Sequence, residues 1–240
     1  MFFPERIKSI YKDDRVLEIG PGATPHPRSD VFLELSYESP EECIKQSGYV
    51  GILETTKPII FYDGLKFPFK DKEFDYVICS HVLEHVPIEN VPLFVSEIER
   101  ISNKGYIEAP SVFYDYIFNH KVHKLLIFPR NNILNIIEKD KLKCGLINDF
   151  FWLIQKYGDS ESTLNFINKN KQLFFWGFEW QDKILYNLVE KIDDLLIESD
   201  LSKFKENLIA SSKCETKDIC SNFSFIKAIT GIKRKLKLFN

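Results

Sequence analysis

The chain has 240 residues, which is enough for one α/β domain with additions. Its 32 basic and 35 acidic side chains leave a net charge of −3. This charge excludes the strongly positive surface of a general nucleic-acid-binding protein. The absence of a signal peptide and of an apolar run of about 18 residues predicts a soluble protein. An odd number of cysteines without Cys-x-x-Cys spacing favours reduced thiols and a cytoplasmic setting: Cys43, Cys79, Cys144, Cys214 and Cys220.

The first predicted elements surround a glycine loop. Residues 4 to 12 favour a helix with a proline in its first turn. An apolar run then leads into Gly20-Pro21-Gly22, and a second apolar run ends at Glu34. In α/β proteins this order places a nucleoside-bearing cofactor at the carboxyl ends of neighbouring parallel strands. The glycines let the backbone approach the ligand, and Glu34 can accept hydrogen bonds from ribose hydroxyls.

The residues after this loop argue against a dinucleotide. A dinucleotide site needs a third glycine and a helix N-terminus at the pyrophosphate, but Pro27 would break a helix begun after Gly22. Only about 14 positions, against roughly 20 in a full unit, separate Gly20 from Glu34. We therefore expect an extended loop through Pro27, with no helix of two turns before Asp30, and a ligand that needs no phosphate cradle.

Two further strands and two helices are predicted before residue 111. A cap at Ser39 predicts a helix start, and residues 59 to 64 predict a strand that ends at Asp63-Gly64. Residues 74 to 80 predict a strand that leads into His81-Val-Leu-Glu-His-Val. Residues 87 to 102 predict a helix with one apolar face, formed by Phe94, Ile98 and Ile101.

Taken together, these motifs resemble a class I S-adenosylmethionine-dependent methyltransferase. The family pattern is a Glu-x-Gly-x-Gly loop, an acid closing strand two, an Asp-Gly/Ala-x-x-x-Pro-Phe segment and a Phe-Asp strand ending near Leu-Glu-His-Val. The resemblance covers residues 14 to 111 and implies S-adenosylmethionine as the cofactor. It also implies a doubly wound, Rossmann-like α/β fold with a mostly parallel sheet. More loosely, Pro-His-Pro-Arg-Ser-Asp and a later His-Lys-Leu-Leu-Ile resemble a subgroup associated with bacterial surface-sugar pathways.

The resemblance also implies a role for each residue of the cofactor site. Glu34 would hold the ribose, and Asp63 would accept a hydrogen bond from the adenine amino group beside the Gly64 backbone. Ser80 and His81 would lie near the methionine end and the methyl group. The implied cofactor-binding residues are Glu18, Gly20, Gly22, Glu34, Asp63, Gly64, Ser80 and His81.

The rest of the chain is predicted to hold the acceptor and to complete the sheet. After the cofactor-binding half, residues 1 to 111, an insert over residues 112 to 170 is predicted to contain a hairpin (125–128 and 133–138) and a helix (146–156). Residues 171 to 210 predict a C-terminal antiparallel strand pair, 173–180 and 183–190, and then a helix from residue 192. Six side chains of the insert are expected either to line an acceptor pocket or to pack the insert onto the sheet. They are Tyr114, Tyr116, His120, His123, Phe150 and Trp152.

Histidines are the candidate catalytic groups. A hydroxyl acceptor benefits from a base, and neutral histidine suits that task near pH 7. His81 is the first candidate and His123 the second, and each would equally suit a structural role. His81-x-x-Glu84-His85 also matches an inverted zinc-protease motif, in which both histidines would lie on one helical face. His120 or His123 could then supply a third ligand. Because the motif follows a buried strand and lies in no long helix, we expect no metal.

The predicted function is therefore methyl transfer from S-adenosylmethionine to a small molecule, with a sugar or lipid-linked glycan as the favoured acceptor. Two alternatives stay open. One is a non-catalytic module of the same fold that has lost the cofactor through its shortened loop. The other is a zinc-dependent hydrolase that uses His81, Glu84 and His85.

The tail over residues 211 to 240 ends in a basic amphipathic pattern. Between residues 223 and 240 five basic residues occur without an acid, beside an apolar stripe at helical spacing. This pattern suits a helix lying on the anionic inner face of a membrane. It equally suits packing on the protein itself or on a second subunit. The stripe consists of Phe225, Ile229, Ile232, Leu236 and Phe239.

Membrane docking through this tail predicts that the full-length protein pellets with anionic liposomes. A version that ends at Asn222 should pellet less, because each basic residue near such a surface contributes about 1 kcal/mol. Co-sedimentation of the two proteins measures this. Equal pelleting, or none by either protein, contradicts docking through the tail.

Overall fold

The computed structural model describes residues 1–47, 53–141, 165, 167–195, 200, 202 and 206. The chain divides into two compact units, residues 1–196 and 197–240. The fold described below is that of the first unit. The helix predicted over 146–156, most of the helix predicted from residue 192 and the amphipathic tail lie outside the described residues. No helix among the described residues is long and apolar enough to span a membrane.

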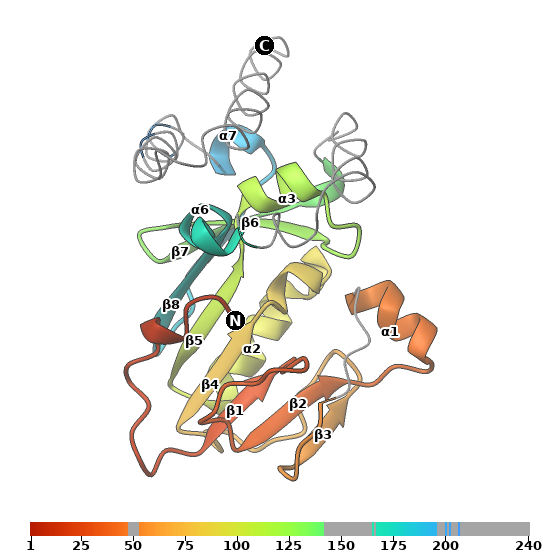
Figure 1. Cartoon of the computed structure of the whole chain (residues 1–240), viewed down its shortest axis with the longest axis vertical. Coiled ribbons are helices and arrows are strands. Elements are labelled where there is room, and N and C mark those ends of the chain that lie inside the picture. Colours follow the sequence, from red (N-terminus) through yellow and green to blue (C-terminus); the bar gives the residue numbers. More distant parts are fainter. Residues whose placement is uncertain are drawn as a thin grey trace. The chain divides into compact units, whose positions relative to one another are not determined.

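Six strands form the main sheet, in the order β3-β2-β1-β4-β5-β8 (Figure 1). The first five are parallel, and β8 joins β5 in antiparallel register. This order, with its reversal beside β1, confirms the doubly wound, mostly parallel α/β fold expected from the sequence. The strands are β1 (Val16–Ile19), β2 (Val31–Leu35), β3 (Ile59–Tyr62), β4 (Tyr76–Ser80), β5 (Lys104–Pro110) and β8 (Phe175–Gln181).

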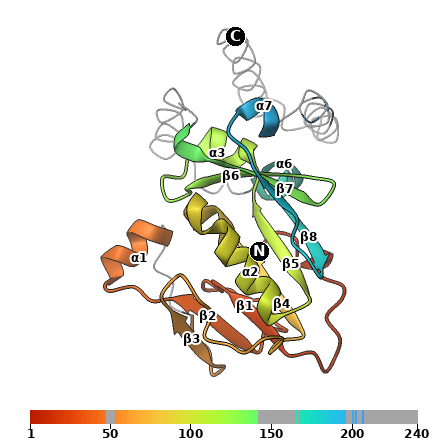
Figure 2. The same cartoon turned by 180° about the vertical axis from the view of Figure 1, so that it is seen from behind.

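Different kinds of structure cover the two faces of the sheet (Figures 1 and 2). On one face lies helix α2 (Val91–Ile101), which buries the predicted apolar positions against the core. On the other face Met1, Ile7 and Ile10 pack against a buried cluster on β1, β4 and β5. Helix α1 (Pro40–Ser47) begins at Ser39, whose hydroxyl accepts a hydrogen bond from the Glu42 amide (3.2 Å), as predicted.

The helix predicted over residues 4 to 12 is wrong in its length. Only Pro4–Arg6 form a 3-10 turn. The segment instead runs along the sheet, where its backbone and side chains bond to β8. The Arg6 guanidinium donates to the Gly177 carbonyl (2.9 Å), and the amides of Lys8 and Ser9 donate to Glu179 (2.9 and 2.8 Å). These bonds and the apolar packing favour an extended path over a helix.

A second, smaller sheet follows the main one in the order β6-β7-β9. The predicted hairpin is confirmed: β6 (Leu125–Arg130) pairs antiparallel with β7 (Ile133–Glu138) across Asn131-Asn132. Both asparagines have positive φ, as a tight hairpin turn requires. Helix α3 (Val112–Phe118), which the sequence analysis did not predict, begins where the Ser111 side chain accepts a bond from the Tyr114 amide.

The predicted C-terminal strand pair is only half correct. β8 closes the main sheet, but β9 (Tyr186–Leu188) pairs parallel to β7 in the other sheet. Ile184 is buried in the core between them, and the backbone on either side of β9 bonds to β7. The chain thus crosses from one sheet to the other after Asp182, which has a φ of +63°. Short elements complete the unit: α6 (Lys171–Phe174) and α7 (Ile192–Leu195).

Candidate functional site

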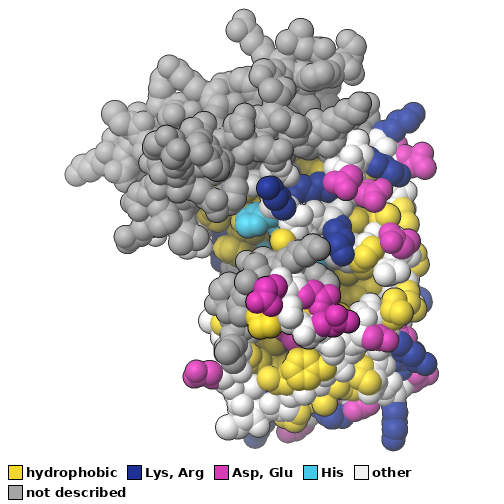
Figure 3. Space-filling model, turned by 90° about the vertical axis from the view of Figure 1, so that its right-hand side faces the viewer, with side chains coloured by type: hydrophobic (Ala, Val, Ile, Leu, Met, Phe, Trp, Pro, Cys, Tyr) yellow, Lys and Arg dark blue, Asp and Glu magenta, His cyan; other side chains and the backbone are white. Residues whose placement is uncertain are grey.

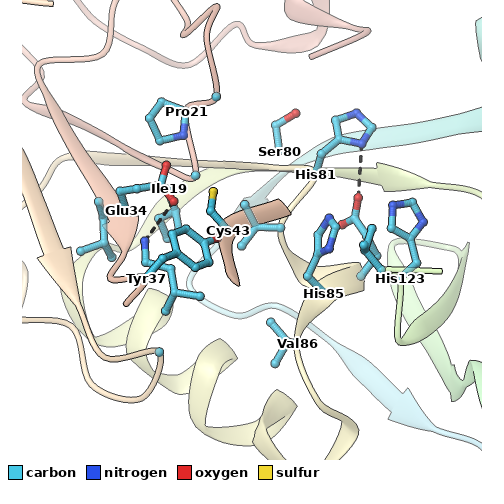
Figure 4. Close-up of a pocket in the computed structure, with 18 of the residues that line it drawn as sticks. Ile19, Pro21, Glu34, Tyr37, Cys43, Ser80, His81, His85, Val86 and His123 are labelled. Carbon is cyan, nitrogen blue, oxygen red and sulfur yellow. Dashed lines mark hydrogen bonds and ion pairs between the residues drawn. The ribbon is translucent and has the colours of Figure 1, made fainter. Parts of the chain in front are cut away.

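A groove runs along the carboxyl ends of β1, β2, β3 and β4 (Figure 4). One end is lined by the glycine loop, Glu34 and Tyr37, and the other by His81, His85 and His123, with Ser80 between them. The groove volume is about 1280 Å³, above the roughly 300–1,000 Å³ of a typical single-ligand pocket. It is therefore large enough for two ligands side by side.

The glycine loop has the conformation that close approach to a ligand requires. Gly20 and Gly22 have φ values of +60° and +57°, which side chains other than glycine adopt at a cost. From Gly22 to Asp30 the chain contains turns and no helix, which confirms the expected effect of the prolines. The buried Glu18 carboxylate holds this loop, since it accepts bonds from the Ser29 hydroxyl (2.6 Å) and the His26 amide (2.8 Å).

Gly20 also has no room for a side chain. A Cβ at this position would lie 2.5 Å from Val82 Cγ2, whereas a Cβ at Gly22 would meet nothing within 4 Å. Val82 is β-branched and short, so its methyl group cannot move aside without a change of rotamer. Contact between the loop after β1 and the loop after β4 therefore depends on glycine at position 20.

The two acids assigned to the nucleoside lie at adjacent strand ends. Glu34 is half-buried at the end of β2, and burial raises the pKa of its carboxyl. One of its oxygens accepts the Leu35 amide at 3.0 Å. Asp63 is exposed just beyond β3, and its Oδ1 accepts the amides of Leu65 (2.9 Å) and Lys66 (3.4 Å). Both carboxylates line the groove.

Beyond β4 the chain turns sharply at His81. This residue has a φ of +60°, a conformation that is unusual for a non-glycine residue and is frequent at functional sites. Its amide donates to the Glu108 carbonyl at 2.8 Å, and a 3-10 turn follows at Leu83–His85. The helical face that the rival zinc-protease motif requires for His81 and His85 is therefore not formed, because only a 3-10 turn follows β4.

Both nitrogens of the His81 ring face carboxylates. Nε2 lies 3.0 Å from Glu108 Oε1, and Nδ1 lies 3.3 Å from Glu84 Oε1. Burial by itself lowers the pKa of His81, but the two carboxylates outweigh burial and raise it. The geometry thus favours a protonated ring that bonds to Glu108 and forms a longer ion pair with Glu84. Phe2 and Phe175 stack on each other with centroids 3.6 Å apart, and each meets this ring edge-on at 5.4 Å.

Glu108, to which the sequence analysis assigns no role, is a centre of hydrogen bonding behind His81. Its side chain is fully buried in β5, and burial raises its pKa, but His81 and the other donors lower it to about 2. An acid within an otherwise apolar strand was the only signal of this residue in the sequence. Its donors, at 2.6–3.0 Å, are the amides of Phe2 and Phe3, the hydroxyls of Ser80 and Tyr106, and His81.

The third histidine of the groove belongs to a buried polar cluster. His123 Nδ1 lies 2.8 Å from Asp115 Oδ1, and Lys139 Nζ lies 3.3 Å from the same oxygen. Because the carboxylate holds Nδ1, the nitrogen left for the groove is Nε2. His120 stacks on His123 with centroids 5.1 Å apart, and burial together with His123 lowers the pKa of His120 to about 4. On the side shown in Figure 3, histidine reaches the surface beside hydrophobic and basic side chains.

The structure thus brings the predicted cofactor residues and both candidate catalytic histidines to one groove. Of the predicted acceptor liners, Tyr114, His120 and His123 line it. Phe150 and Trp152 lie outside the described residues, and the same holds for the side chain of Tyr116. Asp115 and Glu108 were not assigned roles from the sequence, because their partners come from distant segments.

The comparisons with known proteins agree with this arrangement. The sequence profile of a family described as "Methyltransferase domain" matches residues 41–107, from α1 into β5. This match supports S-adenosylmethionine as the cofactor. No curated protein matches the chain.

Several solved structures resemble parts of the chain. The PH0226 protein of Pyrococcus horikoshii is 17% identical over 52% of this chain and 66% of its own, with a TM-score of 0.37. An S-adenosylmethionine-dependent methyltransferase from Mesorhizobium loti is 17% identical over 42% of this chain and 48% of its own, with a TM-score of 0.30. The matched part thus spans between 48% and 66% of the length of those proteins. Similarities this low carry no argument about activity.

The crowding at Gly20 makes a prediction about stability. Gly20→Ala and Gly22→Ala both place alanine at a positive φ, at a cost of about 1–2 kcal/mol each. Only Gly20→Ala adds the collision with Val82. We expect Gly20→Ala to lower the free energy of unfolding, measured by urea denaturation, more than its matched control Gly22→Ala. The double variant Gly20→Ala/Val82→Ala should show a favourable coupling. Equal losses in the two single variants would contradict the collision.

The buried bonds of Glu108 make a second prediction. Glu108→Gln should lower the free energy of unfolding at neutral pH by about 3–5 kcal/mol, because it removes a buried charge that His81 and four other donors share. The exposed acid Asp13 offers a control, Asp13→Asn, which should cost under about 0.5 kcal/mol. A wild-type pKa near 2, against 4.5 for the model compound, means that this stability is lost as the pH falls. The difference between wild type and Glu108→Gln should therefore narrow below about pH 4.5, and a constant difference would refute the assignment.

Proposed function

We propose that the protein is an S-adenosylmethionine-dependent methyltransferase that acts on a small molecule. The observation that carries this proposal is the groove itself. It joins a glycine loop and two strand-end acids, at one end, to a cluster of histidines at the other. The match of the methyltransferase domain profile to residues 41–107 supports the same reaction class.

The residues present fit this cofactor. Gly20 and Gly22 leave the loop free of side chains, and Glu34 and Asp63 offer carboxylate oxygens to hydroxyl and amino groups. No helix follows Gly22, so the loop suits a nucleoside without phosphates better than a dinucleotide. Bound S-adenosylmethionine supplies an electrophilic methyl group, and the protein then needs mainly to position the acceptor and exclude water. Ser80 and His81 are the residues proposed at its methionine end.

The histidine end of the groove is proposed to hold the acceptor. Both ring nitrogens of His81 face carboxylates, so His81 is not free to act as the base expected from the sequence. We assign it instead to positioning the ligands and to supplying a positive charge. His123 is better suited to contact the acceptor, because Asp115 holds Nδ1 and leaves Nε2 for a hydroxyl proton or a cation.

An acceptor rich in hydroxyl groups suits this end of the groove. Tyr114 and His120 offer stacked rings with centroids 5.5 Å apart, and the histidines offer hydrogen-bonding nitrogens. A sugar or a lipid-linked glycan has this chemistry and agrees with the looser sequence resemblance to surface-sugar pathway members. Nothing in the charge balance favours nucleic acid as the acceptor.

Substitution of the two strand-end acids tests the cofactor assignment. Loss of a charged hydrogen-bond partner costs roughly 1.5–3 kcal/mol, so Glu34→Ala and Asp63→Ala should each weaken S-adenosylmethionine binding about tenfold or more. Isothermal titration calorimetry measures this, with the exposed acid Glu54 as a matched control, Glu54→Ala. If both variants bind like the parent, the site assignment is wrong. A wild-type protein that does not bind at millimolar cofactor would favour the non-catalytic alternative.

A further inference from the structure

Glu84 is a buried carboxylate whose hydrogen-bonding capacity is largely unused. Its side chain is 1% exposed, and within the described part of the chain neither oxygen accepts a hydrogen bond of good geometry. Its closest cationic partner among the described residues is His81, whose Nδ1 lies 3.3 Å from Oε1. Burying an ionised carboxylate costs several kcal/mol unless strong partners compensate. His81 contacts only one of the two oxygens, so this carboxylate has room for a second cation beside it.

Two further histidines supply nitrogen atoms close to this carboxylate. One ligand atom from each of Glu84, His85 and His123 lies within 4.8 Å of the other two. In Figure 4 the rings of His85 and His123 lie on either side of the carboxylate that His81 contacts, and they are nearly perpendicular, at 89°. Ligands at about 2.0–2.2 Å from a metal would require each atom to move inward by under about 1 Å.

Asp115 orients His123 as metal-binding histidines are usually oriented. Its two oxygens lie 2.8 and 2.9 Å from His123 Nδ1, so that the ring donates there and Nε2 keeps its lone pair. Asp115 itself is 3% exposed and is anchored by Lys139. A carboxylate behind a liganding imidazole fixes the tautomer and raises the basicity of the ligand.

We propose that Glu84, His85 and His123 bind one divalent transition-metal ion at the acceptor end of the groove. Two imidazoles and one carboxylate are the ligand set of catalytic zinc and of related metals, and they do not suit magnesium or calcium. All three residues line the groove, which leaves a coordination position open to a ligand there. His81 lies outside this ligand set, unlike in the zinc-protease motif considered from the sequence.

The proposed ion gives the acceptor end a chemical role, and this part rests on the proposed methyltransferase function. A metal at an open position polarises an oxygen that contacts it and lowers the pKa of a hydroxyl group. An acceptor with a hydroxyl group, such as a sugar, would be oriented and activated in this way. Metal binding by itself depends only on the three ligands.

Zinc titration of the full-length protein tests the site. After treatment with a chelator, wild-type protein should bind one Zn²⁺ per chain by calorimetry, and Co²⁺ should give the visible absorption of a low-symmetry site. Glu84→Gln, His85→Asn and His123→Asn should each weaken Zn²⁺ binding about 100-fold or more, and Asp115→Asn about 10- to 100-fold. His26→Asn, a histidine of the glycine loop, is the matched control and should bind like wild type.

The outcomes separate this inference from the proposed function. Circular dichroism of the same samples shows that each variant is folded, and S-adenosylmethionine binding is measured on the wild-type protein. Wild-type protein that binds the cofactor but no Zn²⁺, or that binds Zn²⁺ equally in all variants, overturns the metal site alone. Zn²⁺ binding that depends on the three ligands, in a protein that binds no cofactor, supports the metal site and overturns the methyltransferase proposal.

Discussion

The buried carboxylate of Glu108 ties together the segments that form the groove. Two backbone amides of the N-terminal segment, the end of β4 and the His81 ring all bond to it. An ionised carboxylate in the sheet interior requires these donors, because burial alone would raise its pKa, whereas its partners lower it to about 2. The requirement holds the N-terminal segment on one face of the sheet, where Met1, Ile7 and Ile10 pack, and it holds His81 in a left-handed conformation. The shape of the acceptor end thus depends on a residue behind the groove.

The cofactor half of the groove could be predicted from the sequence because its signals are local. Apolar runs that end in Gly20, Glu34 and Asp63 predict both the strands and the edge at which they meet, and Pro27 excludes the helix. The rest depends on contacts between distant segments. The three-residue strand β9 pairs with β7 because Ile184 is buried and the backbone on either side of β9 bonds to β7. The residues of β9 alone indicate neither feature. Pro4 favoured a helix near the N-terminus. In the structure this segment is extended, because it packs on one face of the sheet and bonds to β8.

The histidines show how the same residues change meaning once their neighbours are known. From spacing, His81 is the candidate base and pairs with His85 in a metal motif. In the structure, Glu108 and Glu84 occupy both nitrogens of His81, and the hairpin places His123 beside His85 instead. Asp115, eight positions before His123 in the chain, completes the cluster from α3. Histidine rings are therefore concentrated around one buried acid, at the end of the groove opposite to the nucleoside acids. These hydrogen-bonding groups favour an acceptor with hydroxyl groups over a purely apolar acceptor.

We propose that one groove holds cofactor and acceptor in a fixed order. The electron density of a crystal of the full-length protein soaked with S-adenosylmethionine tests this order. We expect density for the nucleoside beside Glu34 and Asp63, and density for the methionine end beside Ser80 and His81. Density in the reverse orientation, density away from the glycine loop, or an empty groove at a saturating concentration would contradict it.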